Sequence, residues 1–152
     1  MRIYRKIILF LVSLLSSFLS FVFLFIAGIH IYWGFGGEWG KDAVLPKIET
    51  SDRPLFIPGL AATLLVAVVF IIGVFLVQSF VSNITLPIPS SILYYGMIFQ
   101  GTVFFLRSIG EFRYVGFFKT QKGTLFSYWD DRLFSPLCLT VSLFSFALIY
   151  LK

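Results

Sequence analysis

The chain has 152 residues, of which 59% are hydrophobic and only 12% are charged, and its mean hydropathy is +0.95. Soluble domains average about 45–50% apolar and about 25% charged residues, so this composition is typical of membrane proteins. The formal net charge is +5. Because no basic stripe alternates with solvent-exposed aromatics, we expect no nucleic-acid partner.

Single copies of two reactive residues exclude several kinds of site. Cys138 is the only cysteine, so the chain has no partner thiol for an intrachain disulfide or a dithiol redox cycle. His30 is the only histidine, which excludes bis-histidine haem ligation within one chain and disfavours a metal centre. We therefore expect neither a metal nor a cofactor.

Four long apolar runs organise the chain. A hydrocarbon core about 30 Å thick needs roughly 20 helical residues at 1.5 Å rise per residue, and each run is close to that length. The first run follows a short basic prefix and carries no ionisable side chain, and the last contains Ser135-Pro136 as a possible helix start. The sequence predicts an all-α integral membrane four-helix bundle in one domain, 1–152, with spans at about 7–29, 55–81, 90–107 and 133–151.

The connections between these runs predict the topology. The segment 82–89 contains Pro87 and Pro89 and reads as a tight turn. Two crossings separate the loops at about 34–54 and 107–132, so both must lie on one side of the membrane. Eight of the twelve Lys and Arg residues fall on this loop side, which favours cytoplasmic loops, although the N-terminal basic cluster opposes that orientation.

Almost every group able to transfer a proton or bind an anion is brought to the loop side. Ionisable groups at membrane depth are costly and often functional, and a histidine can exchange a proton near neutral pH. The plain alternative for the histidine is an interfacial side chain that bonds a loop carbonyl. The candidate ligand-binding residues are His30, Trp33, Arg107, Glu111, Asp130 and Arg132.

Two spacings refine this expectation. If the third span continues as a helix, Arg107 and Glu111 form an i,i+4 pair, which on a surface contributes only about 0.3–0.5 kcal/mol. In the bundle interior the pair would need partners, and Asp130 or Asp131 could supply them. The glycine-rich segment 36–40 is interpreted as a tight turn rather than an anion site. Stripes of serine in the first and last spans are interpreted as close helix packing rather than a polar path.

Two motifs carry a resemblance to a known family. The first is His30-Ile31-Tyr32-Trp33-Gly34-Phe35-Gly36-Gly37 with Trp39, and the second is Trp129-Asp130-Asp131-Arg132-Leu133-Phe134-Ser135-Pro136-Leu137-Cys138. With Arg107 and Gly110, they resemble a family of small bacterial four-span membrane proteins catalogued only as a domain of unknown function. The resemblance implies the four-span fold and a bacterial inner-membrane location, and it implies no activity.

Three functions remain open from the sequence. The first is binding of a small amphipathic or lipid-like ligand in a loop-side pocket, with Arg107 holding an anionic head and His30 exchanging a proton. The second is a non-catalytic accessory subunit whose loops dock a partner membrane protein. The third is transport of a small solute by an oligomer. No catalytic residue is assigned and the question of an enzyme stays open, while an ion pump is disfavoured because mid-depth positions lack charge.

Overall fold

The computed structural model describes residues 2–47 and 54–152. Within these ranges the regular elements are helices, apart from an isolated bridge between Lys47 and Pro54. Arg53, one of the eight loop-side cations, lies outside the described residues. The elements are α1 (Arg2–Gly34), α2 (Lys41–Val44), α3 (Leu60–Phe80), α4 (Ser90–Ile109), α5 (Leu125–Trp129), the π-helical turn η1 (Asp130–Phe134) and α6 (Ser135–Leu151).

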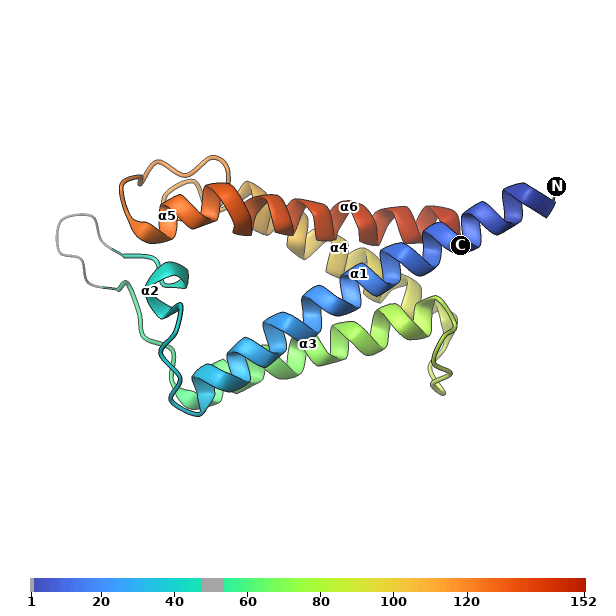
Figure 1. Cartoon of the computed structure of the whole chain (residues 1–152), viewed down its shortest axis with the longest axis horizontal. Coiled ribbons are helices and arrows are strands. Elements are labelled where there is room, and N and C mark those ends of the chain that lie inside the picture. The colour runs from blue at the N-terminus through green and yellow to red at the C-terminus, as the bar shows by residue number, and fades with distance from the viewer. Residues whose placement is uncertain (1, 48–53) are drawn as a thin grey trace.

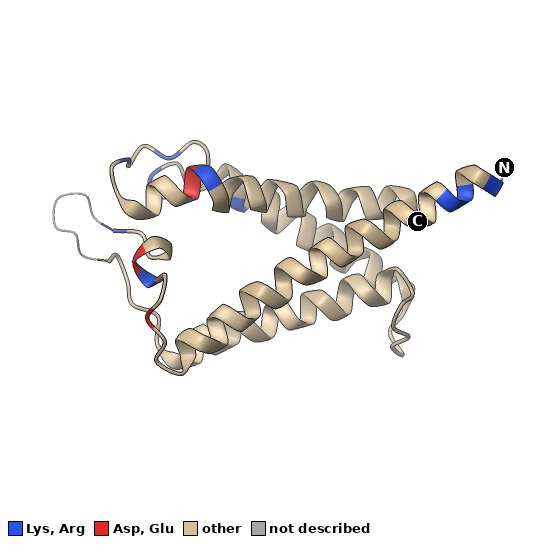
Figure 2. Cartoon of the chain, viewed as in Figure 1, with Lys and Arg blue, Asp and Glu red and all other residues tan. Residues whose placement is uncertain are grey.

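Four helical stretches are long and apolar enough to cross a membrane: α1, α3, α4 and the continuous stretch Leu125–Leu151. The prediction of an all-α protein built on four apolar helices is confirmed. Figure 2 shows the charged residues at the two ends of the helices, with the middle of the bundle free of them. Much of the helix surface is apolar and exposed, as lipid contact requires.

The helices are arranged as two antiparallel pairs. α1 packs along α3 and α4 packs along α6, while the contacts between the pairs are fewer (Figure 1). The pairs diverge toward the end that carries α2 and α5. Both chain termini and the turn between α3 and α4 lie at the other end, in agreement with the predicted topology. We call these the loop end and the terminal end.

The core is a layer of apolar side chains where the two pairs meet. The buried cluster consists of Leu19, Val22, Phe23, Val77, Met97, Val141 and Leu148. Phe23 extends it toward the loop end, because its ring lies 5.6 Å from the rings of both Phe70 and Phe104. Aromatic packing of this kind can link helices in lipid, where burial from water contributes little between them.

In each helix pair, one amide side chain joins the two helices by a hydrogen bond. Gln78 of α3 donates to the Ser20 hydroxyl of α1 at 2.7 Å, and Gln100 of α4 donates to the Ser145 hydroxyl of α6 at 3.0 Å. Ser20 and Ser145 are buried. These contacts support the interpretation of the serine stripes as helix packing, since polar side chains within a bundle satisfy one another across helices.

The last span differs from its expected boundaries. α6 begins at Ser135 with Pro136 in its first turn, but the helical backbone is already continuous from Leu125. The turn Asp130–Phe134 is π-helical. A proline lacks an N–H and its ring crowds the carbonyl four residues earlier, here that of Arg132, and a wide turn accommodates this crowding. The turn also sets the direction of the acidic pair at its start.

Candidate functional site

The candidate site lies at the loop end and centres on Asp130. This carboxylate is 0% exposed and is held at the first residue of the π-helical turn. The helix that carries it is anchored by Thr124, whose side-chain oxygen accepts a hydrogen bond from the Ser127 N–H at 3.1 Å. A side-chain cap of this kind satisfies a backbone donor at a helix start. The Thr124 cap therefore fixes the start of the helix that leads to Asp130.

Three donors surround the Asp130 carboxylate. Arg107 Nη2 donates to Oδ1 at 2.9 Å, and both the Gly116 N–H at 2.8 Å and Lys119 Nζ at 3.0 Å donate to Oδ2. Lys119 also pairs with Asp131, the next residue of the π-helical turn. We call these four side chains, Arg107, Lys119, Asp130 and Asp131, the ion cluster. Its formal charges cancel, and its two fully buried members, Lys119 and Asp130, pair with each other.

The ion cluster holds the irregular segment that follows α4 in place. α4 ends at Ile109, and the chain then folds back so that the Phe117 N–H donates to the Ser108 carbonyl at 2.9 Å. Gly116 adopts a left-handed backbone conformation with φ of 90° and lies against Gly110. The Gly116 carbonyl also accepts a hydrogen bond from Lys119 Nζ at 3.2 Å. The loop is thus held by backbone contacts as well as by the ions.

Lys119 is the member of this site that sequence reasoning missed. Its side chain is fully buried, although it lies in a segment without regular secondary structure. No residue pattern around it distinguishes it from the exposed Lys122 three residues later. Its role depends on a loop that returns to the helix ends, and such a return has no periodicity in the sequence.

Arg107 and Asp130, both expected in the site, are brought together, and one guanidinium nitrogen is left over. Arg107 Nη1 is buried and has no hydrogen-bond partner among the described residues. An unpaired N–H on a charged group is costly, so such a donor calls for a partner. The side chain as a whole is 33% exposed, which leaves it a path to the surface.

Glu111 and Arg132 are placed outside the ion cluster. The conditional i,i+4 pair of Arg107 with Glu111 does not form, because α4 ends before Glu111. The Glu111 carboxylate instead accepts hydrogen bonds from the N–H groups of Arg113 and Tyr114, an exposed turn. Arg132 stacks over the Tyr128 ring at 3.8 Å and is exposed.

His30 and Trp33 lie on the opposite helix pair, near the end of α1. His30 Nδ1 lies 2.8 Å from the Ile26 carbonyl and donates to it, which leaves Nε2 as the acceptor nitrogen. The His30 ring lies 5.1 Å from the Trp33 ring and 6.2 Å from the Phe70 ring. Phe70 in turn lies 6.1 Å from Phe104, one turn before Arg107. Ring contacts therefore run from His30 through Phe70 to Phe104, one helical turn before Arg107.

The glycine-rich segment after α1 forms a helix-ending turn. The Gly36 N–H donates to the Trp33 carbonyl and the Gly37 N–H to the Tyr32 carbonyl, the two hydrogen bonds of a Schellman motif, with Gly36 at φ of 92°. Trp33 Nε1 donates to the Trp39 carbonyl at 2.8 Å. The first sequence motif thus closes a turn, as the plainer interpretation of the glycines predicted.

The ion pairs of the ion cluster limit the chemistry available at the loop end. In the described part of the chain, no three His, Cys, Asp or Glu side chains lie close enough to hold a metal ion. The cations and anions of the ion cluster neutralise each other. The ion cluster leaves Arg107 Nη1 for a ligand, His30 Nε2 lies on the opposite helix pair, and the exposed surface of the loop is available to a partner.

The family model described as "Protein of unknown function (DUF3995)" matches residues 23–145. This range contains both motifs and the whole ion cluster. No curated protein and no solved structure matches the chain.

Proposed function

We propose that this chain, which belongs to the family of proteins of unknown function (DUF3995), is a multi-pass accessory subunit that docks a partner membrane protein at its loop end. The family and the four apolar helices indicate a membrane protein of unknown activity. The resemblance to small bacterial four-span proteins supports the bacterial inner membrane as its location. The observation that carries the docking proposal is a loop held by hydrogen bonds that exposes aromatic side chains.

This docking loop comprises residues 110–119. Its backbone is fixed at Gly116 and Phe117, and its interior is filled by Lys119 and Asp130. Phe112 and Phe118 nevertheless remain 60% and 62% exposed, and their rings lie 6.4 Å apart. A segment that is already ordered loses little entropy on binding, and large aromatic side chains are common interface anchors.

Charge indicates the kind of partner. Because the ion cluster is neutral within itself, the charge beside the docking loop comes from the cations Arg113, Lys122 and Arg132 and from the carboxylate of Glu111. Arg113 and Arg132 stack on tyrosine rings, and Lys122 is exposed nearby. Such a surface is complementary to a partner that combines acidic groups with an apolar patch. The larger number of Lys and Arg residues at this end, eight against four at the terminal end, favours a cytoplasmic loop end.

Photo-crosslinking from the docking loop tests this proposal. A photoreactive residue at Phe118, introduced in cells that encode the protein, is expected to give one protein adduct of defined mass. Charge reversal by Arg113→Glu with Lys122→Glu is expected to reduce that adduct about tenfold, which corresponds to 1.4 kcal/mol. The matched control is the same probe at Phe21 of α1, which is 69% exposed in the apolar part of the bundle and should give no protein adduct.

Three outcomes would contradict docking to a different protein with acidic groups. An adduct of twice the chain mass would indicate a second copy of this chain. Lipid adducts alone at Phe118 would show that the aromatics are anchors in the membrane interface, as at many membrane–water boundaries. An adduct that survives charge reversal unchanged would show that acidic groups of the partner do not contribute to docking.

A second candidate function, binding of an amphipathic ligand, is favoured by the unpaired Arg107 Nη1. We propose for this case that an anionic head accepts a hydrogen bond from Nη1 while an apolar part lies along Phe70 and Phe104. His30 Nε2 would exchange a proton with the ligand, with Trp33 packed against the imidazole. Glu111 and Arg132 would contribute only at the rim, because the structure places them outside the ion cluster.

Native mass spectrometry of the protein extracted in mild detergent tests this ligand. Arg107→Lys keeps the charge beside Asp130 but removes the forked guanidinium, and it is expected to lower the amount of a co-purified small molecule about tenfold. Arg132→Lys is the matched control, because it makes the same chemical change on an exposed arginine. Equal retention in both variants, or no bound molecule in the wild type, would contradict the ligand.

A further inference from the structure

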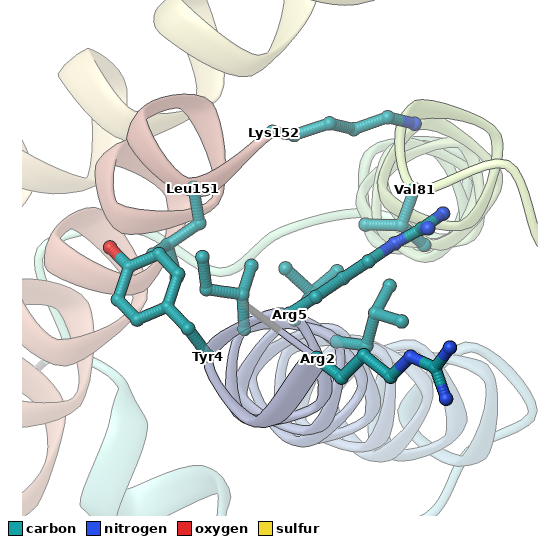
Figure 3. Close-up of a pocket in the computed structure, with 9 residues that line it drawn as sticks. Arg2, Tyr4, Arg5, Val81, Leu151 and Lys152 are labelled. Carbon is teal, nitrogen blue, oxygen red and sulfur yellow. The ribbon is translucent and has the colours of Figure 1, made fainter.

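The terminal end of the bundle carries a groove that neither proposed function uses. It has a volume of about 650 Å³ and lies between the start of α1 and the ends of α3 and α6 (Figure 3). Three cationic side chains, Arg2, Arg5 and Lys152, line it together with Tyr4. Apolar residues complete the lining: Ile8, Leu9, Val12, Val81 and Leu151.

The cations at this groove have no acidic side chain to neutralise them. All seven Asp and Glu residues of the sequence occur at positions 38–52 and 111–131. The charged side chains of the segments that form the terminal end are therefore all cationic: Arg2, Arg5, Lys6 and Lys152. Like charges that converge on one groove repel each other, so an anion seated among them would be stabilised by every one of them.

Donors are free to receive such an anion. Figure 3 shows the guanidinium group of Arg5 and the amine of Lys152 on the side of the groove nearest Val81, while the guanidinium group of Arg2 lies beside α1, farther from Val81. Lys152 Nζ donates to the Phe80 carbonyl and, at 2.8 Å, to the Ser82 hydroxyl, and a third N–H remains. Burial lowers the pKa of the Lys152 amine, and an adjacent anion would counter that effect by favouring the charged form.

The lining of the groove distinguishes a lipid from a small anion. Leu9 is 59% exposed on α1 and continues the groove into the apolar surface of the bundle. Tyr4 lies beside Leu151 at the rim, a position typical of interfacial aromatics (Figure 3). A free phosphate would use only the cations, whereas a phospholipid would use the cations through its headgroup and the apolar lining through an acyl chain.

We propose that this groove binds one anionic phospholipid of the surrounding leaflet. Arg2, Arg5 and Lys152 hold the headgroup phosphate, and an acyl chain follows Leu9 and Val12 along α1. Basic residues beside a membrane helix commonly attract anionic lipids, and here the groove provides a defined binding site for one of them. The binding is independent of the loop end and of any partner docked there.

Lipid titration of the delipidated full chain, followed by native mass spectrometry, tests the proposal. The wild type is expected to retain one phosphatidylglycerol about tenfold more tightly than phosphatidylcholine. The double variant Arg2→Gln with Arg5→Gln is expected to abolish this preference. Lys6→Gln is the control for charge on α1: it removes one cation from the same helix, but Lys6 does not line the groove, so the preference should persist.

A second variant tests the acyl seat without changing charge. Leu9→Trp is expected to fill the apolar part of the groove and weaken phosphatidylglycerol retention about tenfold, with the elution volume of the protein unchanged. Loss of preference in Lys6→Gln equal to that of the double variant would overturn the site, because it would indicate general surface attraction. Full competition by millimolar inorganic phosphate would also overturn it, because the groove would then hold a small anion rather than a lipid.

Discussion

Replacing Asp130 with asparagine is expected to lower the free energy of unfolding by about 3–5 kcal/mol, the range for breaking a buried ion pair by removing one partner. The amide cannot carry the charge that Lys119 and Arg107 require, and the fully buried Lys119 would be left with the partly exposed Asp131 as its ionic partner. Unfolding of the protein in mixed detergent micelles, followed by circular dichroism, measures the change. Asp42→Asn is the matched control, because Asp42 pairs with Lys47 at 3.2 Å while 81% exposed and should cost at most about 1 kcal/mol.

A double-mutant cycle separates the ion pair from general damage at this position. If Asp130 and Lys119 depend on each other, Asp130→Asn combined with Lys119→Met should cost less than the sum of the two single changes, by about 0.5–3 kcal/mol. Additive losses would show that the two side chains contribute independently. A loss in Asp130→Asn no larger than in Asp42→Asn would contradict the assignment of Asp130 as the centre of the loop end.

Gly116→Ala is the second change with a large expected effect. A Cβ at this position would lie 2.2 Å from the Ile109 carbonyl oxygen and 2.5 Å from the Gly110 Cα, both of them backbone atoms that cannot rotate away. The residue also has φ of 90°, which costs a side chain about 1–2 kcal/mol by itself. The loop would have to move, and the hydrogen bond from the Gly116 N–H to Asp130 would be lost.

Trypsin cleavage and thermal unfolding together measure this effect. Lys119 is buried in the wild type, so cleavage after it is expected to be slow beside cleavage after the exposed Lys122, and to become comparable in Gly116→Ala. Gly36→Ala is the matched control: Gly36 has nearly the same φ, 92°, but nothing lies within 4 Å of the place that its new methyl group would occupy. That variant should lose only the conformational cost of about 1–2 kcal/mol. Equal losses in the two variants would refute the backbone overlap.

The four apolar helices and their topology could be predicted because each depends on a property of a continuous segment. A run such as 55–81 must span or be buried whatever its neighbours do, since apolar length alone sets the cost of leaving lipid. The even number of crossings then places the segments before Leu60 and after Ile109 at one end without any knowledge of packing. The gathering of Arg107 and Asp130 at that end follows from the same counting.

The partners within the site could not be predicted, because they depend on where the chain turns. Glu111 lies one helical turn beyond Arg107 in the sequence, yet α4 ends first and Glu111 caps the following turn instead. Lys119 enters the bundle only because Gly116 lets the loop fold back onto Ser108. His30 and Arg107 share an end of the molecule but belong to different helix pairs.

By itself, then, the sequence determined the membrane class, the four helices and the end at which charge collects, because hydrophobic length and charge are properties of local segments. The tertiary structure alone decided that Lys119 and not Glu111 completes the ion cluster, and that the cations of the terminal end converge on a groove. Ion pairing acts over a few ångströms, so its partners are chosen by the folded path of the backbone and not by distance along the chain.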